Sequence, residues 1–339
     1  MIIKFIQDTY KFNRSLLSEG TDETLNYIKK NHKKIKIIKF KSGKKVYDWR
    51  IPKVWSVKDS FFKNNKGKKF ADFKKNNLHL VSYSKSIKKK ILKKDLLKKI
   101  YTHKIPNAIP YVTSYYKSDW GFCLTKKEKS GLKDNEYLVN IDTKKKNGYL
   151  KIGEYFHKGV SKYEILFSTY ICHPSMANNE LSGPAVQNHL INFIKKKKTN
   201  FSYRFLFLPE TIRSIAYINK KFPDLKKRVI AGFNLTCLGD NGPYSMIETK
   251  YKNTLSDQLL YNSIKNKKKF KKYSLLERGS DERQFCSQNV NLPVTCFCRS
   301  KFGTFKEYHT SLDNLNFVKE KHLKESFNVM KGIVKILEN

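Results

Sequence analysis

The sequence predicts an α/β protein with a mainly parallel sheet and a smaller, mostly β insertion. From about residue 138 onward, apolar strand-like runs alternate with helix-like stretches. That alternation is typical of a parallel sheet whose strands are joined by helices. Between residues 46 and 137, short strand-like pieces predominate instead. The chain has 339 residues, enough for about two domains of roughly 150 residues each.

We therefore expect a smaller unit that interrupts a larger one. Residues 1–45 and 138–339 would form an α/β domain, and residues 46–137 an inserted small β-rich domain. The chain contains no internal repeat and no proline-rich or glycine-rich linker that would indicate another division. The boundaries therefore rest on the change of pattern alone.

The N-terminal part predicts two helices and several short strands. Thr21 can cap the first helix, whose apolar face carries Leu25 and Ile28, because a threonine oxygen accepts a free N–H of the first turn. The strands are expected at residues 35–40, 46–51, 70–73, 78–83, 111–115 and 120–124, and the second helix at residues 87–101.

Further along the chain, strands and helices are expected in turn. The strands are expected at residues 137–142, 149–155, 164–170, 203–208, 229–238 and 292–299, and the helices at residues 183–195, 211–219, 255–266 and 321–337. In parallel sheets the loops that leave the carboxyl ends of strands carry function. Polar residues directly after a strand are therefore the first candidates for a reaction site.

The chain is strongly basic. It holds 70 Lys+Arg against 29 Asp+Glu, a formal net charge of +41. The excess is largely lysine, in short runs such as residues 88–90, 195–198 and 267–269, whereas arginine is sparse. Because arginine is the preferred reader of phosphates and base edges, this pattern favours solvated lysine faces and disfavours nucleic acid as a partner. Polyanion binding stays as an alternative.

Membrane insertion and disulfide bonding are not expected. The chain shows no apolar run of about 18 residues, the length of a membrane span, and its start lacks the pattern of a secretory signal. Six cysteines occur without CxxC spacing, which favours buried free thiols. They are Cys123, Cys172, Cys237, Cys286, Cys296 and Cys298. A cytoplasmic location is the resulting expectation.

The first candidate motif is ILFSTYICHPSMANNELSG, residues 165–183. An apolar strand leads into His173, and Pro174 stiffens the turn because its ring fixes the backbone. Glu180 follows near the start of the next helix, where the helix dipole favours negative charge. An imidazole and a carboxylate that converge on one loop suit zinc. A lone histidine is more often structural, so His173 is a candidate ligand only together with Glu180 and the later motifs.

Two further motifs end on apolar strands. FLFLPETIRS, residues 205–214, delivers Glu210 to a strand end, where a carboxylate destabilises the fold unless it is paired, coordinated or catalytic. Glu210 suits a general base that takes a proton from water; a simple helix N-terminal charge is the alternative. AGFNLTCLGD, residues 231–240, ends in Asp240, which is either a carboxylate near the metal or a turn residue.

The last two motifs bracket the final strand. RGSDERQF, residues 278–285, contains Asp281 and Arg283; the planar guanidinium could hold a substrate carboxylate, or form a local ion pair. KEYHTSLDN, residues 306–314, contains His309 and Asp313. Asp313 could orient a histidine or cap the helix that follows. Among eight histidines, only His173 and His309 stand in strand-end loops of this kind.

Together these motifs resemble a known family. The phrases STYICHPSMANNELSGP, PETIRSIAY, NLTCLGD, RGSDERQF and EYHTSLDNL occur in that order and resemble bacterial aminopeptidase-like proteins with a domain of unknown function, which are linked to polysaccharide biosynthesis loci. DWRIPKVW and IPYVTSYYKSDWGFCL resemble the inserted small β domain of that family. The resemblance covers nearly the whole chain. It implies a three-layer α/β/α zinc-exopeptidase-like (phosphorylase/hydrolase-like) fold.

The resemblance also implies a zinc site. His173 and His309 would be ligands, and the segment 178–180 would supply a carboxylate, here Glu180. Glu210 would be the base or a further ligand. Arg283, or a backbone amide, would hold the oxyanion that develops during the reaction.

Three departures from the dizinc aminopeptidases favour one zinc ion, although a second stays open. Asn179 and Thr236 stand where those enzymes carry aspartates, and Glu210 stands alone where they carry two glutamates. Asn179, Asp240 and Asp281 are the candidates for binding a second metal or for hydrogen bonds to the ligands of the first.

The resulting hypothesis is a zinc-dependent hydrolase that acts on an amide bond of a peptide or an amino sugar. A second hypothesis is a degenerate peptidase fold that binds a glycan or a peptide without cleaving it. Polyanion binding is a third. The expected partner is a small peptide or an amino-sugar substrate, and assembly into a homo-oligomer is compatible with the sequence.

Overall fold

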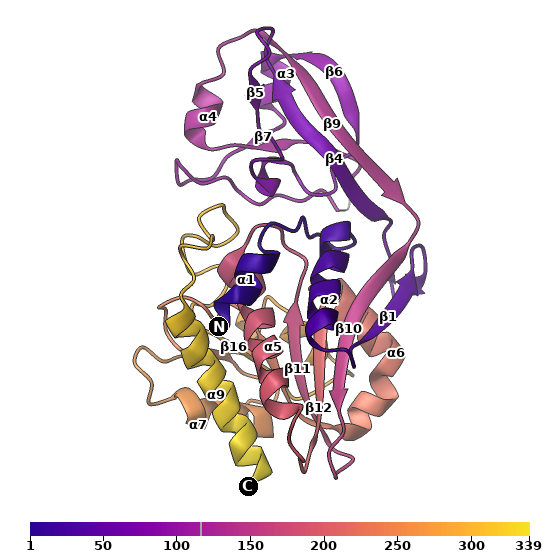
Figure 1. Ribbon diagram of the computed structural model, residues 1–339, viewed down its shortest axis with the longest axis vertical. Coiled ribbons are helices and arrows are strands. Elements are labelled where there is room, and N and C mark those ends of the chain that lie inside the picture. The colour runs from indigo at the N-terminus through magenta and orange to yellow at the C-terminus, as the bar shows by residue number, and fades with distance from the viewer. Residues whose placement is uncertain (116) are drawn as a thin grey trace.

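The structure, a computed structural model, describes residues 1–115 and 117–339, and consists of a large α/β part beneath a smaller β-rich part (Figure 1). The large part is built on a sheet of eight strands in the order β1-β10-β12-β11-β13-β16-β14-β15. These strands are β1 (Lys36–Lys41), β10 (Tyr149–His157), β12 (Ser202–Leu208), β11 (Glu164–Tyr170), β13 (Val229–Leu235), β16 (Val294–Cys298), β14 (Ser245–Ile247) and β15 (Lys271–Tyr273).

The centre of the large sheet is parallel and its margins are mixed. β11 pairs in parallel with β12 and with β13, and β13 pairs in parallel with β16. β10 is antiparallel to both β12 and β1, and β14 is antiparallel to β16. The carboxyl ends of the four central strands therefore meet at one edge, which faces the small β-rich part.

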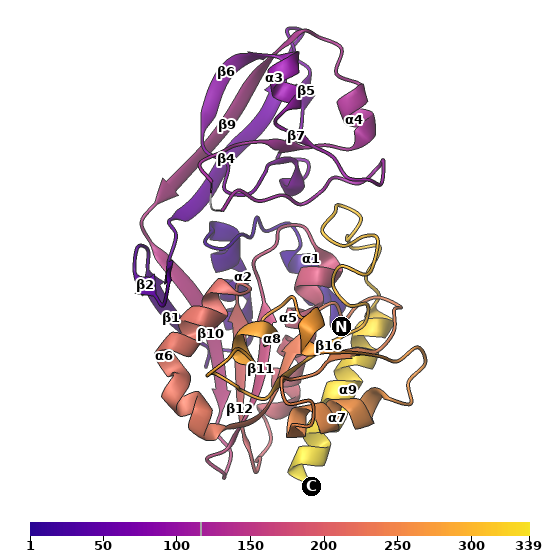
Figure 2. The same cartoon turned by 180° about the vertical axis from the view of Figure 1, so that it is seen from behind.

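Helices cover both faces of the sheet, as Figures 1 and 2 show from the two sides. One face packs against α1 (Ile3–Thr9), α2 (Glu19–Asn31), α5 (Ser182–Ile194), α7 (Leu255–Ile264) and α9 (Glu320–Glu338); the other packs against α6 (Ile212–Arg228) and α8 (Glu282–Phe285). Successive strand residues alternate between the two cores: Phe205 and Phe207 lie in the first, Leu206 and Leu208 in the second. The predicted three-layer α/β/α class is confirmed.

The small part lies between β1 and β10 in sequence. Its sheet has the order β5-β4-β9-β6. The strands are β4 (Val54–Lys63), β5 (Lys69–Phe70), β6 (Ile87–Leu92) and β9 (Glu136–Lys146). Short elements complete it: β2 (Lys45–Val46), β3 (Trp49–Arg50), β7 (Ile100–Tyr101), β8 (Phe122–Cys123), α3 (Lys93–Leu97), α4 (Lys126–Ser130) and the 3₁₀ turn η1 (Asn77–His79). A second 3₁₀ turn, η3 (Leu275–Glu277), lies in the large part.

Several local predictions in the small part are wrong. The helix expected at residues 87–101 is β6, then α3, then β7. Ile87 and Ile91 stand four residues apart, a spacing that also suits a helix, but β6 pairs residue for residue with β9, and this tertiary pairing overrides the local propensity. Its lysines suit an edge strand, because charge there discourages further pairing.

Three more differences concern turns and caps. Residues 78–83 and 111–115 form no strands and share only the isolated bridge Ser82–Thr113. The hairpin β2–β3 replaces the strand expected at 46–51. The cap of α2 is Ser18, whose side chain accepts the N–H of Thr21, so Thr21 is the capped residue and not the cap.

Gly183, at the start of α5, allows this helix to lie close to the sheet. A Cβ at this position would stand 2.2 Å from the carbonyl oxygen of Leu235 and 2.4 Å from Oγ1 of Thr169. These two atoms are themselves hydrogen-bonded at 2.9 Å. We expect Gly183→Ala to lower the free energy of unfolding by about 1–3 kcal/mol, the usual cost of overpacking a core, as measured by urea denaturation.

Gly332 in α9 provides the control for this prediction. No atom lies within 4 Å of a Cβ built there, and alanine has the higher helix propensity. Gly332→Ala should therefore leave the stability unchanged or raise it by up to about 1 kcal/mol. Equal stabilities for the two variants would show that α5 is not held by the contact at Gly183.

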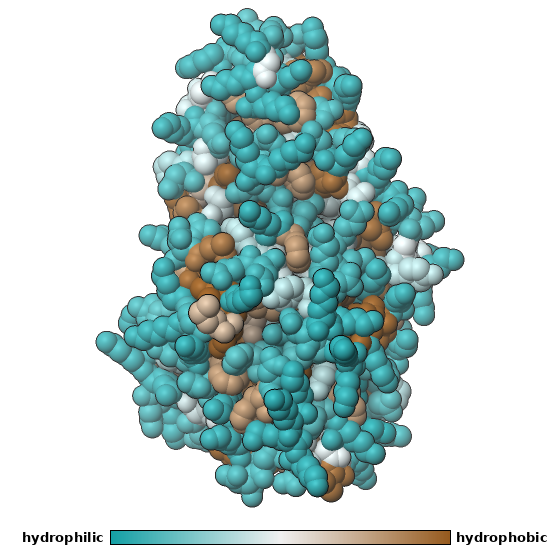
Figure 3. Space-filling model, viewed as in Figure 1, coloured by the Kyte–Doolittle hydropathy of each residue, from teal (hydrophilic) through white to brown (hydrophobic). Residues whose placement is uncertain are grey.

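The surface is hydrophilic over most of the face seen in Figure 3. Four of the eight arginines, Arg14, Arg204, Arg213 and Arg299, are buried, so half of the side chains best suited to phosphates point inward. This distribution gives no support to a polyanion-binding role. Over the part of the chain that the structure describes, no helix combines the length and the apolar character that a membrane span requires.

Candidate metal centre

His173 lies between two carboxylates. It lies three residues after the carboxyl end of β11 and is 6% exposed. Its Nδ1 lies 2.5 Å from Oε2 of Glu180, and its Nε2 lies 3.8 Å from Oε2 of Glu210. The first contact is a hydrogen bond, whereas the second is too long for one, and no described residue forms a hydrogen bond to Nε2.

Glu180 belongs to a single π-helical turn, η2 (Ala177–Leu181), directly before α5. Such turns occur frequently at functional sites. Arg14 lies behind the carboxylate: its Nε is 4.0 Å from Oε1 of Glu180 and donates to the carbonyl oxygen of His173 at 2.9 Å. Both side chains are fully buried. Arg14 therefore compensates the charge of Glu180, a role that the sequence did not reveal.

Asp313 holds the η2 turn from the opposite side. Its carboxylate accepts the backbone N–H groups of Asn178 at 2.6 Å and Asn179 at 2.8 Å, and its carbonyl accepts that of Ala177 at 3.0 Å. Burial raises the pKa of Asp313 to about 7, although these N–H groups lower it. The expectation that Asp313 orients a histidine or caps the following helix is wrong, because it fixes the turn that carries Glu180.

Glu210 stands on a backbone in an unusual conformation. It follows β12, and the next residue, Thr211, has a φ of 64°, which a β-branched residue rarely adopts. Two residues hold this turn: Asp281 accepts the N–H of Thr211 at 2.7 Å, and Arg283 donates to the hydroxyl of Thr211. Asp281 also accepts the hydroxyl of Ser214 at 2.8 Å. Asp281 and Arg283 thus fix the direction in which Glu210 points.

The two carboxyl groups on this side of the site share a low-polarity environment. Burial raises the pKa of Glu210, with a partial offset from His173, although 21% of the side chain is exposed. Burial, and then the charge of Glu210, raise the pKa of Asp281 to about 8. A carboxylate with a raised pKa is a better acceptor for a proton.

His309 approaches the same place from the loop before α9. The centroids of the His309 and His173 rings are 5.1 Å apart, and Tyr308 stacks on His309 at 3.9 Å. The Nε2 atom of His309 is buried and has no hydrogen-bond partner among residues 1–115 and 117–339. Burial and the neighbouring His173 lower the pKa of His309 well below its ordinary value. Its imidazole is therefore neutral, with a lone pair free to bind a metal.

The pKa of His173 is shifted in the opposite direction from that of His309. Burial alone would lower its pKa, but Cys172 and Glu180 raise it well above the ordinary value. The Cys172 thiol lies 3.6 Å from Nδ1 and accepts the N–H of Glu210 at 3.3 Å. Burial raises the pKa of this thiol to about 11, and His173 offsets part of the rise. The prediction that all six cysteines are buried and free is confirmed.

Asn179 and Asp240, two candidates for a second metal site, use their side chains in hydrogen bonds to other protein groups. Asn179 donates to the hydroxyl of Tyr170 at 2.6 Å, Tyr170 is hydrogen-bonded to the hydroxyl of Thr236, and Thr236 donates to the carbonyl oxygen of Asn179 at 3.1 Å. This is a closed, neutral network. Asp240 accepts from the side chains of Asn178 at 2.6 Å and Ser300 at 2.8 Å. These contacts favour the turn interpretation of Asp240.

The donor set fits zinc. In the described residues, sixteen buried side-chain polar atoms lack a hydrogen-bond partner. Buried polar groups are nearly always paired, yet two of these atoms, Oε1 of Glu180 and Nε2 of His309, are potential metal ligands in this cluster. Cys172, His173 and Glu180 also form a potential metal-binding group, with ligand atoms within 4.8 Å of one another. Imidazole nitrogen and carboxylate oxygen are typical zinc ligands.

The 2.5 Å contact to Glu180 decides which nitrogen of His173 is available. Two ligands of one tetrahedral zinc, each at about 2.0–2.2 Å, lie about 3.3 Å apart. No ion therefore fits between Nδ1 and Oε2 of Glu180 as they stand. Among the described residues, the nitrogen of His173 without a hydrogen bond is Nε2, on the side of Glu210; because the pKa of His173 is raised, Nε2 must lose its proton before it can bind a metal.

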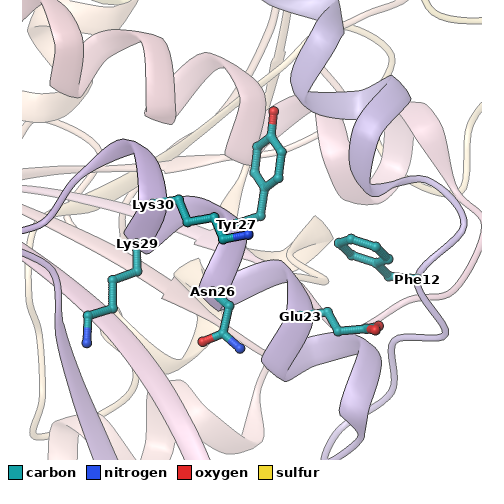
Figure 4. A pocket seen from close by; sticks show the side chains of 6 residues that line it. All are labelled: Phe12, Glu23, Asn26, Tyr27, Lys29 and Lys30. Carbon is teal, nitrogen blue, oxygen red and sulfur yellow. The ribbon is translucent and has the colours of Figure 1, made fainter.

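A surface hollow of about 610 Å³ lies apart from this cluster (Figure 4). It is lined by residues of α2 and by the preceding loop, and shares no residue with the site. The lining residues are Phe12, Glu23, Asn26, Tyr27, Lys29 and Lys30. The hollow holds no group that could take part in the chemistry of the two histidines.

The fold is that of the α/β exopeptidases. A zinc aminopeptidase of Bacillus subtilis superposes with a TM-score of 0.66 at 12% identity, over 99% of this chain and 94% of its own. A peptidase M28 precursor of Shewanella amazonensis superposes with a TM-score of 0.64 at 9% identity, over 100% of this chain and 93% of its own. At these identities the likeness concerns the fold alone.

The chain belongs to the family described as a domain of unknown function (DUF4910), whose profile matches residues 3–339. A Clostridium acetobutylicum protein, named as a proposed polysaccharide biosynthesis protein with an aminopeptidase-like domain, is 40% identical over 342 residues, which cover 100% of this chain and 78% of that protein. The crystal structure of a proposed peptidase from Clostridium acetobutylicum superposes with a TM-score of 0.96 at 38% identity, over 100% of this chain and 80% of that one. The family resemblance predicted from the motifs is confirmed.

Proposed function

We propose that this protein is a zinc-dependent, aminopeptidase-like hydrolase that acts on an amide bond. One observation carries the proposal: the rings of His173 and His309 lie 5.1 Å apart, and Glu210 faces the free Nε2 of His173 at 3.8 Å. Imidazole and carboxylate groups are typical donors of catalytic zinc sites, which keep one position open for water. The fold of the zinc aminopeptidases supports the same conclusion.

His173 and His309 would hold the metal through their Nε2 atoms. Zinc, when bound, supplies Lewis-acid chemistry: it polarises a carbonyl oxygen and makes a water molecule more acidic. Glu180, which the sequence suggested as the third ligand, bonds to Nδ1 of His173. As placed, it would orient the ring and raise its basicity, as carboxylates behind metal-binding histidines do.

Glu210 is the proposed general base. It faces the side of His173 that is free of hydrogen bonds, and burial raises its pKa. Both properties suit a group that takes a proton from an attacking water and returns it to a leaving amine. Arg283 and Asp281 support it by holding Thr211. The sequence also predicts that Arg283 binds the oxyanion, and its Nε has no hydrogen-bond partner among the described residues. The contact with Thr211 supports a holding role beside it.

The substrate class follows from the context of the family. An amide bond occurs both in a peptide and on an acylated amino sugar, and the name of the Clostridium acetobutylicum relative refers to polysaccharide biosynthesis. We propose a small peptide or an amino-sugar amide as the substrate. The proposed setting is the cytoplasm, which the six free cysteines support because thiols stay reduced there.

A second candidate function rests on the closed network around Asn179. In that network amide and hydroxyl groups occupy the place where a second metal would need carboxylates. A protein with such a site could bind a peptide or a glycan without cleaving it. Metal content and turnover distinguish the two functions.

The first test is the metal content per chain, by elemental analysis, of the wild type and of His173→Ala and His309→Ala. We expect about one zinc in the wild type, because amide and hydroxyl groups stand where a second ion would need carboxylates, and loss of the metal in both variants. His322→Ala is the control: its ring contacts Glu325 on α9 and it should retain the metal.

The outcome separates the two candidate functions. A wild type that holds no metal after zinc has been supplied would favour the binding module over the hydrolase. Zinc retained in both His173→Ala and His309→Ala would place the metal elsewhere and remove the basis of the proposed mechanism.

A further inference from the structure

The loop that carries His309 is held by the small β-rich part. In Figures 1 and 2 the yellow-orange loop before α9 reaches toward that part. Segment 109–111 and segment 309–311 lie side by side: Pro110 and Thr310 form an antiparallel bridge. Ile109 donates to Oγ of Ser311 at 3.0 Å and accepts the N–H of Ser311 at 2.9 Å. Two segments about 200 residues apart thus form one small sheet-like contact.

The contact fixes the backbone of His309 itself. His309 has a φ of 54°, in the left-handed region that favours glycine. Such a conformation persists only where the surroundings determine it. Here the carbonyl oxygen of His309 accepts the N–H of Tyr111 at 2.8 Å, and Ser311, two residues further on, makes both bonds to Ile109. The direction of the His309 side chain therefore depends on segment 109–111.

Tyr111 also touches both histidines. Its ring centroid lies 5.2 Å from that of His173 and 5.2 Å from that of His309, with interplanar angles of 72° and 87°. Edge-to-face contacts at this distance are favourable. The hydroxyl of Tyr111 is bonded to that of Tyr115 at 2.7 Å, which keeps the ring in place. The three rings of Tyr111, His173 and His309 are thus mutual neighbours.

We propose that the small β-rich part completes the metal site, with Tyr111 as the positioning residue for His309. This inference rests on the proposed function, because it concerns the histidine that would hold the metal. Tyr111 acts in two ways: its N–H holds the backbone of His309, and its ring limits the rotation of both imidazoles. Ser311 supports it by accepting the N–H of Ile109.

A merely structural contact between the two parts would not need this arrangement. A docking surface could use any exposed loop, whereas here the contact ends on the residue whose Nε2 is buried and unpartnered. The inserted segment also reaches His173, which comes from a different strand. The insertion therefore sets the relative position of both imidazoles, and metal affinity should depend on it.

The test is zinc affinity, measured by competition with a chelating dye, together with the absorption spectrum of the Co²⁺-substituted protein. Tyr111→Ala and Ser311→Ala should bind zinc about 10–100-fold more weakly, as is usual when an outer partner of a ligand is lost, and should shift the Co²⁺ bands. Tyr111→Phe and Ser311→Thr keep the ring and the hydroxyl, so both should stay near the wild type. Ser86→Ala, which removes a bond to Ile141 inside the small part, is the control.

Each outcome has a distinct meaning. Thermal unfolding shows whether each variant is folded. If Tyr111→Ala does not fold, the zinc affinity of Ser311→Ala still tests the inference. Unchanged zinc affinity and unchanged Co²⁺ spectra in both alanine variants would overturn the inference and leave the proposed function intact. A wild type that binds no zinc would overturn the proposed function, and this inference with it. Equal losses in Tyr111→Phe and Tyr111→Ala would assign the effect to the hydroxyl and contradict the role of the ring.

Discussion

Glu210→Gln should lower turnover by a factor of about 10²–10⁴, the usual contribution of a general base, while the bound zinc is retained. Glutamine keeps the shape of glutamate but cannot accept the proton. The Glu210 carboxylate stands 3.8 Å from Nε2 of His173 and has a raised pKa, so its loss removes the proton acceptor on this side of the ring. The measurement is kcat with aminoacyl and acetamido-sugar substrates, beside zinc content by elemental analysis.

Glu180→Gln is the matched variant, because Glu180 faces the other nitrogen of the same ring. Its carboxylate orients His173, so we expect weaker zinc binding by about 10–100-fold and near-normal turnover once zinc is saturating. Loss of zinc from Glu210→Gln would make Glu210 a ligand and contradict its role as the base. Unchanged turnover in Glu210→Gln would exclude Glu210 from the chemistry.

The strand-end residues of this site could be predicted because the topology itself brings them together. β11 and β12 are parallel neighbours, with Tyr170 opposite Leu208. His173 and Glu210 follow these strands by three and two residues, so their side chains emerge at the same edge of the sheet. A single sequence contains the apolar strands and the polar residues that follow them, and the rule for parallel sheets supplies their proximity.

Arg14 and Tyr111 could not be predicted in this way. Arg14 reaches the carbonyl oxygen of His173 across 159 positions of sequence, from a loop with no strand pattern. Tyr111 comes from the inserted part, in a segment that was expected to be a strand and is an irregular loop. Their roles depend on how distant elements dock, and side-chain periodicity contains no information about docking.

The role of Asp281 shows a different limit. A carboxylate in a dense polar motif suggested a metal contact, and the same residue instead accepts the N–H of Thr211. The unusual φ of Thr211 is what requires such a partner. Since a threonine in the left-handed region is not visible in the sequence, the need for Asp281 was not visible either.

Arg204→Met should destabilise the fold by about 3–5 kcal/mol, the cost of leaving buried charges unpaired. Arg204 in β12 donates twice to Glu164, at 2.7 and 3.0 Å, and once to Glu154 at 2.7 Å. All three side chains are at most 10% exposed. Without the guanidinium, the two carboxylates of the neighbouring strands keep their desolvation penalty and lose their partner. Urea denaturation measures the change.

Arg228 offers the control on the same acid. Its Nη1 lies 3.8 Å from Oε1 of Glu164, but its side chain is 50% exposed, and exposed pairs contribute less than about 1 kcal/mol. Arg228→Met should therefore change stability by less than about 1 kcal/mol. If the penalty for Arg204→Met arises from the stranded charges, Arg204→Met combined with Glu154→Leu and Glu164→Leu should recover most of the loss. A triple variant less stable than Arg204→Met would show that the ion network itself stabilises these strands.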